Sequence, residues 1–125
     1  MNQKNIFTVI AAILILQGIA FFFMGNTMAG ESFPNLDDAG KGAVAVIMEV
    51  LGLLSVTIGL ITYAVRGNND VLWAYLLGFV LLTANTLKHR FIDDLNVPIP
   101  AMVIQVGILL ACVYLWTKSR GSSAS

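Results

Sequence analysis

Four long apolar runs constrain this chain more than any other feature of its sequence. Each is close to the roughly 20 residues that a helix needs to cross about 30 Å of hydrocarbon. Inside a bilayer the backbone must satisfy its own hydrogen bonds, so each run should be a helix. We expect one domain over residues 1–125, an all-α integral membrane four-helix bundle with antiparallel, up-down-up-down helices. The expected spans are residues 6–24, 43–65, 71–87 and 97–117.

The composition agrees with a lipid bilayer as the solvent. Hydrophobic residues make up 58% of the chain and charged residues 11%, whereas ordinary soluble domains carry about 25% charged residues. The net charge is zero, and without a basic patch we expect no nucleic-acid partner. Cys112 is the only cysteine and His89 the only histidine, which excludes an intramolecular disulfide, a CxxC pair and a multi-histidine metal site within one chain. We predict no catalytic residue, no metal and no cofactor.

The segments between the runs are polar. Residues 25–42 are rich in glycine and acidic residues, so we expect a solvated loop, with Asp37 or Asp38 as the N-cap of the next helix. Residues 66–70 should make a tight turn, and residues 118–125 should form a flexible tail. We expect the first run to be retained as a span, because it is long for a signal peptide and no A-x-A site follows it.

Lysine and arginine counts in the connecting segments set the expected orientation. With the N-terminus inside, four of these residues lie on the inner side of the membrane and three on the outer side. We therefore expect both termini to be cytoplasmic. The inner group is Lys4, Arg66, Lys118 and Arg120, and the outer group is Lys41, Lys88 and Arg90.

Each run carries a strongly polar side chain in the same half of the membrane. Counted inward from the outer ends at 1.5 Å per residue, Gln17, Glu49 and Gln105 lie at a depth of roughly 10–12 Å. Asn85 is shallower, and His89 lies one turn further out, near the interface. We expect these five residues to line a polar pocket toward the outer face, where they bind a small ligand or handle a proton.

Helical spacing places these polar residues on faces that also carry small residues. Small residues let helices pack closely in lipid, and we expect Gly52, Gly59 and Gly78 to be helix-packing positions. In chain order, the expected inward faces are Ile10, Ile13, Gln17, Ala20 and Met24; Ala45, Glu49, Gly52, Val56 and Gly59; Gly78, Leu82, Asn85 and His89; and Ala101, Gln105, Ile108 and Cys112.

Glu49 is the most informative of the polar residues. A charged group at the centre of the hydrocarbon costs at least about 2.5–3.5 kcal/mol, so its side chain should face the bundle and be protonated or hydrogen-bonded. The amides of Gln17, Asn85 and Gln105 can donate to a carboxylate. Plainer interpretations stay open, because intramembrane polar groups often only bond helices together, and His89 can simply face lipid headgroups.

The stretch MEVLGLLSVTIGLITY, residues 48–63, resembles the second helix of DoxX-like small membrane proteins. The matching positions are Glu49, Gly52 and Gly59, whereas the first run lacks the GxxK-type ending that many of these relatives carry. The resemblance implies four transmembrane helices and a bacterial inner membrane. Some members are described as subunits of thiosulfate:quinone oxidoreductase, which implies a quinone-linked redox component as one function.

Three functions therefore compete. The polar pocket favours a protein that binds or transports a small ligand or a proton. The absence of any long soluble segment fits a structural or accessory subunit, with a homo-oligomer or a larger membrane complex as its partner besides the lipid bilayer. A quinone-linked component is the third. No nucleophile–base pair is visible in the sequence, which favours a non-enzymatic role.

Overall fold

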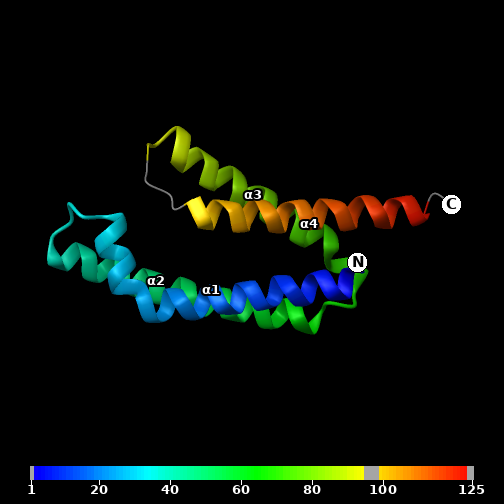
Figure 1. The fold of residues 1–125 in the computed structure, drawn as a ribbon, viewed down its shortest axis with the longest axis horizontal. Helices are drawn as coiled ribbons and strands as arrows, with labels where there is room; N and C mark the ends of the chain where they lie inside the picture. The colour runs from blue at the N-terminus through cyan, green and yellow to red at the C-terminus, as the bar shows by residue number, and fades with distance from the viewer. Residues whose placement is uncertain (1, 95–98, 124–125) are drawn as a thin grey trace. The chain divides into compact units, whose positions relative to one another are not determined.

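The chain folds into four long helices in a computed structural model that describes residues 2–94 and 99–123. They are α1 (Gln3–Ser32), α2 (Asp38–Ala64), α3 (Leu72–Phe91) and α4 (Ile99–Ser123), with a short 3₁₀ turn, η1 (Asn69–Val71), before α3 (Figure 1). These residues contain no strand, which confirms the all-α class and is consistent with a four-helix bundle. All four helices are long and apolar enough to cross a membrane, as expected of an integral membrane protein.

The chain divides into two compact units. One unit is Phe7–Arg66, which contains the antiparallel pair of α1 and α2. The other is Met1–Ile6 with Gly67–Ser125, which contains the pair of α3 and α4.

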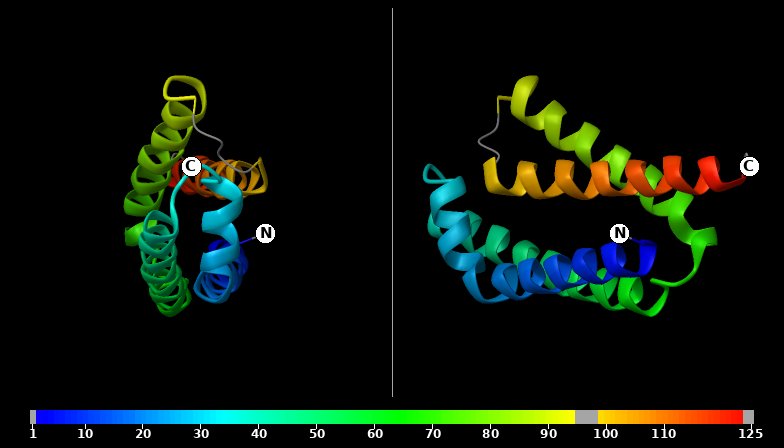
Figure 2. Two further views of the ribbon diagram at one scale, coloured as in Figure 1. Left: turned by 90° about the vertical axis from the view of Figure 1, so that its left-hand side faces the viewer. Right: turned by 45° about the vertical axis from the view of Figure 1, so that its right-hand side comes forward.

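Helix α1 is longer than expected, because residues 25–32 continue the helix instead of forming a loop. The segment contains no proline, and the helix ends at Ser32, two residues before Pro34. A residue that precedes proline is driven away from the α-helical region, so Phe33 cannot extend the helix. The last turns of α1, coloured cyan, bend away from the axis of the earlier part (Figures 1 and 2).

Helix α2 begins at the expected cap. The Asp37 carboxylate accepts a hydrogen bond of 2.8 Å from the Gly40 backbone N–H, which satisfies one of the free donors in the first turn. At the other end, the Arg66 guanidinium donates to the Tyr63 carbonyl oxygen over 2.6 Å and lies 3.8 Å above the Tyr63 ring. Both ends of α2 therefore have their backbone groups partnered by side chains.

The third and fourth helices also run past their expected ends. Helix α3 continues through Lys88, His89 and Arg90, where positive charge favours the negative end of the helix dipole. Helix α4 continues to Ser123, so residues 118–123 are helical and not the expected flexible tail. Nothing in this stretch breaks a helix as proline would. Two of the residues given to the last span, Val97 and Pro98, lie outside the described residues, as does the end of the tail at residues 124–125.

Backbone-to-backbone contact holds α1 and α2 together. A Cβ atom added to Gly52 would lie 2.5 Å from the Gly18 carbonyl oxygen, and one added to Gly18 would overlap the Gly52 carbonyl oxygen. A Cβ atom on Gly59 would lie 3.0 Å from the Ala11 carbonyl oxygen. The expected face of α2 is therefore confirmed as the face that packs on α1. Close approach of this kind is what small residues permit in membrane helices.

The expected face of α1 is wrong by one position. The residues that meet α2 include Ala11, Gly18 and Gly25, which recur every seven residues, and not the face that contains Gln17. On α2 the partners Ala45, Gly52 and Gly59 repeat with the same period. We call these two rows the small-residue stripes. A seven-residue period keeps each stripe on the contact as the helices coil about each other.

In the second pair, α3 and α4 cross at an angle (Figure 2). The buried residues of α4 lie on the expected face, with Ile108 and Cys112 followed by Leu115. The expected face of α3 is wrong, because the buried residues are Leu72, Phe79 and Thr83. Apolar residues such as phenylalanine bury more area than glycine or asparagine, and the larger side chains decide the face.

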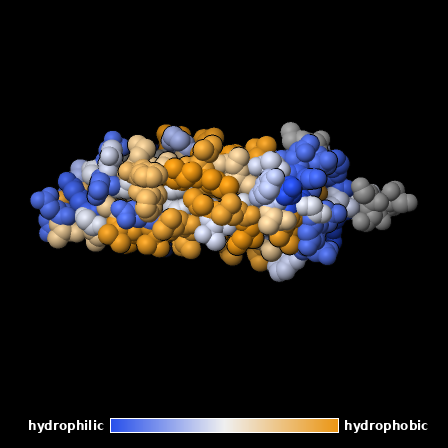
Figure 3. Space-filling view, turned by 90° about the horizontal axis from the view of Figure 1, so that it is seen from below, coloured by the Kyte–Doolittle hydropathy of each residue, from blue (hydrophilic) through white to orange (hydrophobic). Residues whose placement is uncertain are grey.

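Large apolar side chains cover the outside of the helices, as lipid contact requires. Leu16, Leu53, Leu81 and Leu110 are each more than half exposed. Figure 3 shows the face over α1 and α2, where hydrophobic side chains gather in the middle and hydrophilic side chains at both ends. This distribution matches a slab of hydrocarbon between two aqueous layers.

Candidate functional site

Glu49 lies on the face of α2 that packs on α1, and it is half-buried. Its Cγ atom is opposite Gly25, where an added Cβ atom would be 3.7 Å away. Among the described residues, no group hydrogen-bonds to the Glu49 carboxyl or forms an ion pair with it. A carboxyl group within a membrane helix thus has no partner in its own hairpin.

Gln17 does not reach Glu49. The pairs Gly18 with Gly52 and Gly25 with Ala45 set Glu49 level with position 21, four residues from Gln17, which corresponds to about 6 Å along the helix. The adjacent Gly18 is at the level of Gly52, whereas the Glu49 side chain extends toward Gly25, which is at the level of Ala45. The register of the hairpin therefore separates two residues that we expected at one depth.

Gln105 has a partner that the sequence did not indicate. Its side-chain oxygen lies 2.7 Å from the Thr86 hydroxyl, which joins α4 to α3. The same hydroxyl lies 3.0 Å from the Leu82 carbonyl oxygen. One hydroxyl proton serves only one acceptor, and a Gln105 amide turned over, with its NH₂ group donating to Thr86, satisfies both contacts. This geometry matches the plainer interpretation of Gln105 as a link between helices.

Asn85 and Gly78 lie on a part of α3 that is not packed. The Asn85 side chain is exposed and has no hydrogen-bond partner among the described residues. A Cβ atom added to Gly78 would meet no atom of these residues within 4 Å. Gly78 is therefore not a packing position in this structure, in contrast to Gly52 and Gly59.

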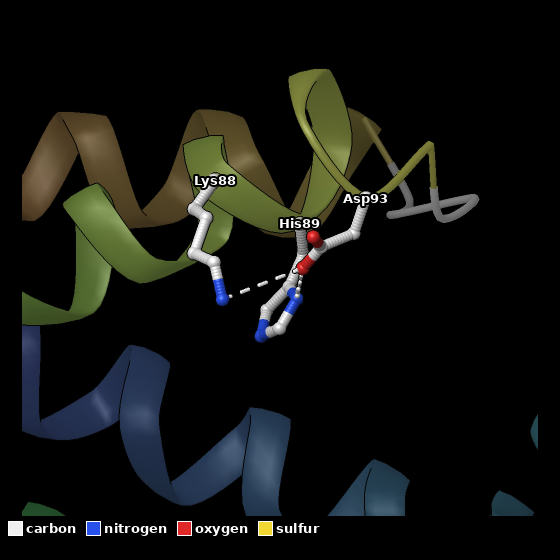
Figure 4. Close-up of polar contacts among 3 residues, drawn as sticks. All are labelled: Lys88, His89 and Asp93. Atoms are coloured by element: carbon white, nitrogen blue, oxygen red, sulfur yellow. Dashed lines mark hydrogen bonds and ion pairs between the residues drawn. The ribbon is translucent and has the colours of Figure 1, made fainter.

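His89 belongs to a charged cluster at the end of α3 (Figure 4). Its Nδ1 atom is 2.7 Å from the Asp93 carboxylate, and the Lys88 ammonium is 3.7 Å from the same oxygen. The Asp93 backbone N–H also bonds to the Lys88 carbonyl oxygen just past the end of the helix, and Asp94 follows with a φ of 56°. The contacts of Lys88 and His89 with Asp93 stabilise the last turn of α3. They match the plainer interpretation of His89 as a residue at the membrane interface.

Two further polar residues, Ser55 and Thr83, lie at buried or part-buried positions that the hydropathy pattern does not indicate. The Ser55 hydroxyl on α2 donates to the Leu14 carbonyl oxygen of α1 over 2.8 Å. Thr83 on α3 is 7% exposed, and its hydroxyl has no hydrogen-bond partner among the described residues. For Ser55, helical spacing could have indicated the contact with α1, because Ser55 falls between Gly52 and Gly59 on one face of α2.

The expected site residues fall into the two units. Gln17 and Glu49 belong to the first unit, and Asn85, His89 and Gln105 belong to the second. Within the described residues, no group of three or more His, Cys, Asp or Glu side chains is placed to hold a metal ion. The chain matches no protein-family model, no curated protein and no solved structure.

Proposed function

We propose that this protein is a small multi-pass membrane protein whose Glu49 is the protonatable group of a polar intramembrane pocket that binds or transports a small ligand or a proton. The observation that carries the proposal is the Glu49 carboxyl, which has no partner among the described residues. Charge within lipid costs at least about 2.5–3.5 kcal/mol and is rare outside functional sites. A purely structural glutamate would be bonded, as Gln105 is to Thr86.

The positions of the basic residues on α2 limit the class of ligand that Glu49 can bind. The basic residue closest to it along α2 is Lys41, eight residues earlier, which corresponds to about 12 Å along the helix axis. The Glu49 carboxylate therefore lacks a compensating charge from its own helix. A proton or a cationic group neutralises it, whereas an anionic ligand would add to the cost of burial. We propose protons or small cations as the class of ligand.

The protonation state of Glu49 in bilayers tests this function. Difference infrared spectroscopy across pH, with Glu49→Gln to assign the carboxyl band, should show a band that titrates. Glu31→Gln is the matched control, because Glu31 is exposed at the end of α1. A Glu49 band that stays unchanged at every pH would mean a sealed carboxyl and would overturn the proposal.

A structural or accessory role is the second candidate, and Asn85 favours it. An exposed amide on an apolar helix is stabilised when a neighbouring helix supplies a hydrogen bond, and the open backbone at Gly78 leaves room for close approach. A homo-oligomer or a larger membrane complex would supply that helix. Native mass spectrometry in mild detergent should then show an assembly that Asn85→Leu dissociates, whereas a monomer in both proteins would count against this role.

The location is also a proposal. A bacterial inner membrane and membership of the DoxX-like group rest on the likeness of residues 48–63 alone. Cytoplasmic termini rest on the distribution of lysine and arginine.

A further inference from the structure

We infer that the last turns of α1, residues 25–32, form a lid beside Glu49 whose position depends on the charge of the Glu49 carboxyl. This inference rests on the proposed function, because it requires that Glu49 gains and loses a proton. It goes further by naming the segment that regulates access to the carboxyl.

The bend of α1 places this segment next to Glu49. The last turns leave the axis of the first part of the helix (Figure 2). Gly25, at the start of the segment, packs on α2, where an added Cβ atom would lie 3.0 Å from the Ala45 carbonyl oxygen and 3.7 Å from Glu49 Cγ. One turn later Ala29 is completely buried. The stem of Glu49 therefore lies against the point from which the segment departs.

The Glu49 side chain extends toward residues 25–32 of α1. Side chains of a helix lean toward its N-terminus, so the carboxyl leans toward the level of Ala45 and the start of α2. Residues 33–37, which join α1 to α2 on this side, are all exposed. Water that hydrates the Glu49 carboxylate from this side therefore reaches it past the last turns of α1.

The surrounding charges are few. Glu31 lies on the segment itself, Asp38 and Lys41 lie on the first turn of α2, and Asp37 lies in the loop. The three acidic groups repel a charged Glu49 and one basic group attracts it, so proximity alone does not stabilise the carboxylate. Hydration does, and the half-buried Glu49 gains more of it when the last turns of α1 move aside. A protonated Glu49 carboxyl does not require hydration, so residues 25–32 can pack against α2.

Spin labelling of the segment tests the lid. A nitroxide is attached to a cysteine at exposed Thr27, in the Cys112→Ala background, with the whole chain in lipid vesicles. The matched control carries the label at Leu16, exposed on the earlier part of α1. We expect the label at Thr27 to become more mobile and more accessible to water as pH rises, and the label at Leu16 to remain unchanged.

Two variants separate the lid from other causes. Glu49→Gln mimics the protonated acid and should hold the Thr27 label immobile at every pH, whereas Glu31→Gln should leave the pH response intact. A response that persists in Glu49→Gln would overturn the lid. So would a constant Thr27 spectrum in a protein whose Glu49 infrared band titrates, and that result would leave the proposed function standing. A Glu49 band that does not titrate would overturn both.

Discussion

Thr86 and Gln105 show how single polar side chains join two apolar helices. Their part-buried contact of 2.7 Å lies between α3 and α4. Such bonds between membrane helices contribute roughly 0.6–2 kcal/mol, because the unfolded chain in lipid also finds partners. The stability of the second unit should therefore depend measurably, though modestly, on this one pair.

A double-mutant cycle on this pair should reveal the coupling. Thr86→Val and Gln105→Leu should each lower the free energy of unfolding by about 0.6–2 kcal/mol, and the double variant by less than the sum. Equilibrium denaturation in detergent micelles measures these values. Asn85→Leu is the control, since the Asn85 amide has no partner among the described residues and should lose no bond. Strict additivity would argue that the two side chains do not interact.

Thr83 offers the opposite case on the same helix. Its buried hydroxyl has no partner among the described residues, and an unsatisfied buried hydroxyl costs roughly 1–3 kcal/mol. Thr83→Val keeps the shape and removes the hydroxyl, so it should leave the free energy of unfolding unchanged or raise it. The same micelle denaturation checks this beside Thr86→Val. A clear loss of stability at position 83 would show that the hydroxyl is bonded in the membrane.

At the scale of elements, the small-residue stripes define how α1 meets α2. The contact depends on missing side chains, because the Gly18 and Gly52 backbones occupy the space where Cβ atoms would lie. The Ile15 and Val56 side chains fill the space beside these positions. The pairing therefore gains its stability from backbone contact and dispersion, which a single added methyl group disrupts.

Alanine substitutions should separate packed from open glycines. Gly52→Ala should destabilise the hairpin by about 1–3 kcal/mol, since the added Cβ atom meets backbone that cannot yield. Gly30→Ala, within α1 but with nothing within 4 Å of its Cβ atom, should stabilise the helix by about 1 kcal/mol. Free energies of unfolding in micelles give both signs. Equal effects at the two sites would refute the close packing.

The sequence allowed only part of this packing to be predicted. The face of α2 followed from the spacing of Glu49, Gly52 and Gly59 because glycines and a polar group coincided there. On α1 the inward face was assigned from the polar Gln17, whereas the contact with α2 is made at the adjacent Gly18. The absence of a side chain therefore predicts this helix contact better than polarity does. Low hydropathy suggested a loop at residues 25–32, although a helix needs only permissive residues and continues until a breaker such as Pro34.

At the scale of the whole molecule, the thickness of a bilayer made the fold class predictable. Four runs near 20 residues leave few alternatives to four membrane helices. The candidate site was less predictable, because equal depth along separate helices does not fix which side chains meet. The hairpin register sets the Glu49 side chain beside Gly25 and about one helical turn from Gln17. Gln105 met Thr86, whose hydroxyl carries no signal in a hydropathy pattern.

The orientation gives a test at this scale. Single cysteines at Asn35, between α1 and α2, and at Arg120, near the end of α4, should differ in their reaction with a membrane-impermeant maleimide. In intact cells we expect labelling at position 35 and none at position 120, with both labelled after lysis. The native Cys112 is completely buried and gives the background. Labelling of position 120 in intact cells would reverse the proposed topology.

The small-residue stripes carry a consequence for how such a chain can change over generations. Lipid accepts any apolar side chain on the outer faces, so those positions can drift freely among leucine, isoleucine, valine and phenylalanine. Positions 18, 25, 52 and 59 tolerate almost no volume. A descendant of this chain could therefore lose nearly all sequence identity while keeping the same hairpin. The seven-residue spacing of its small residues would then identify a relative more readily than overall sequence similarity.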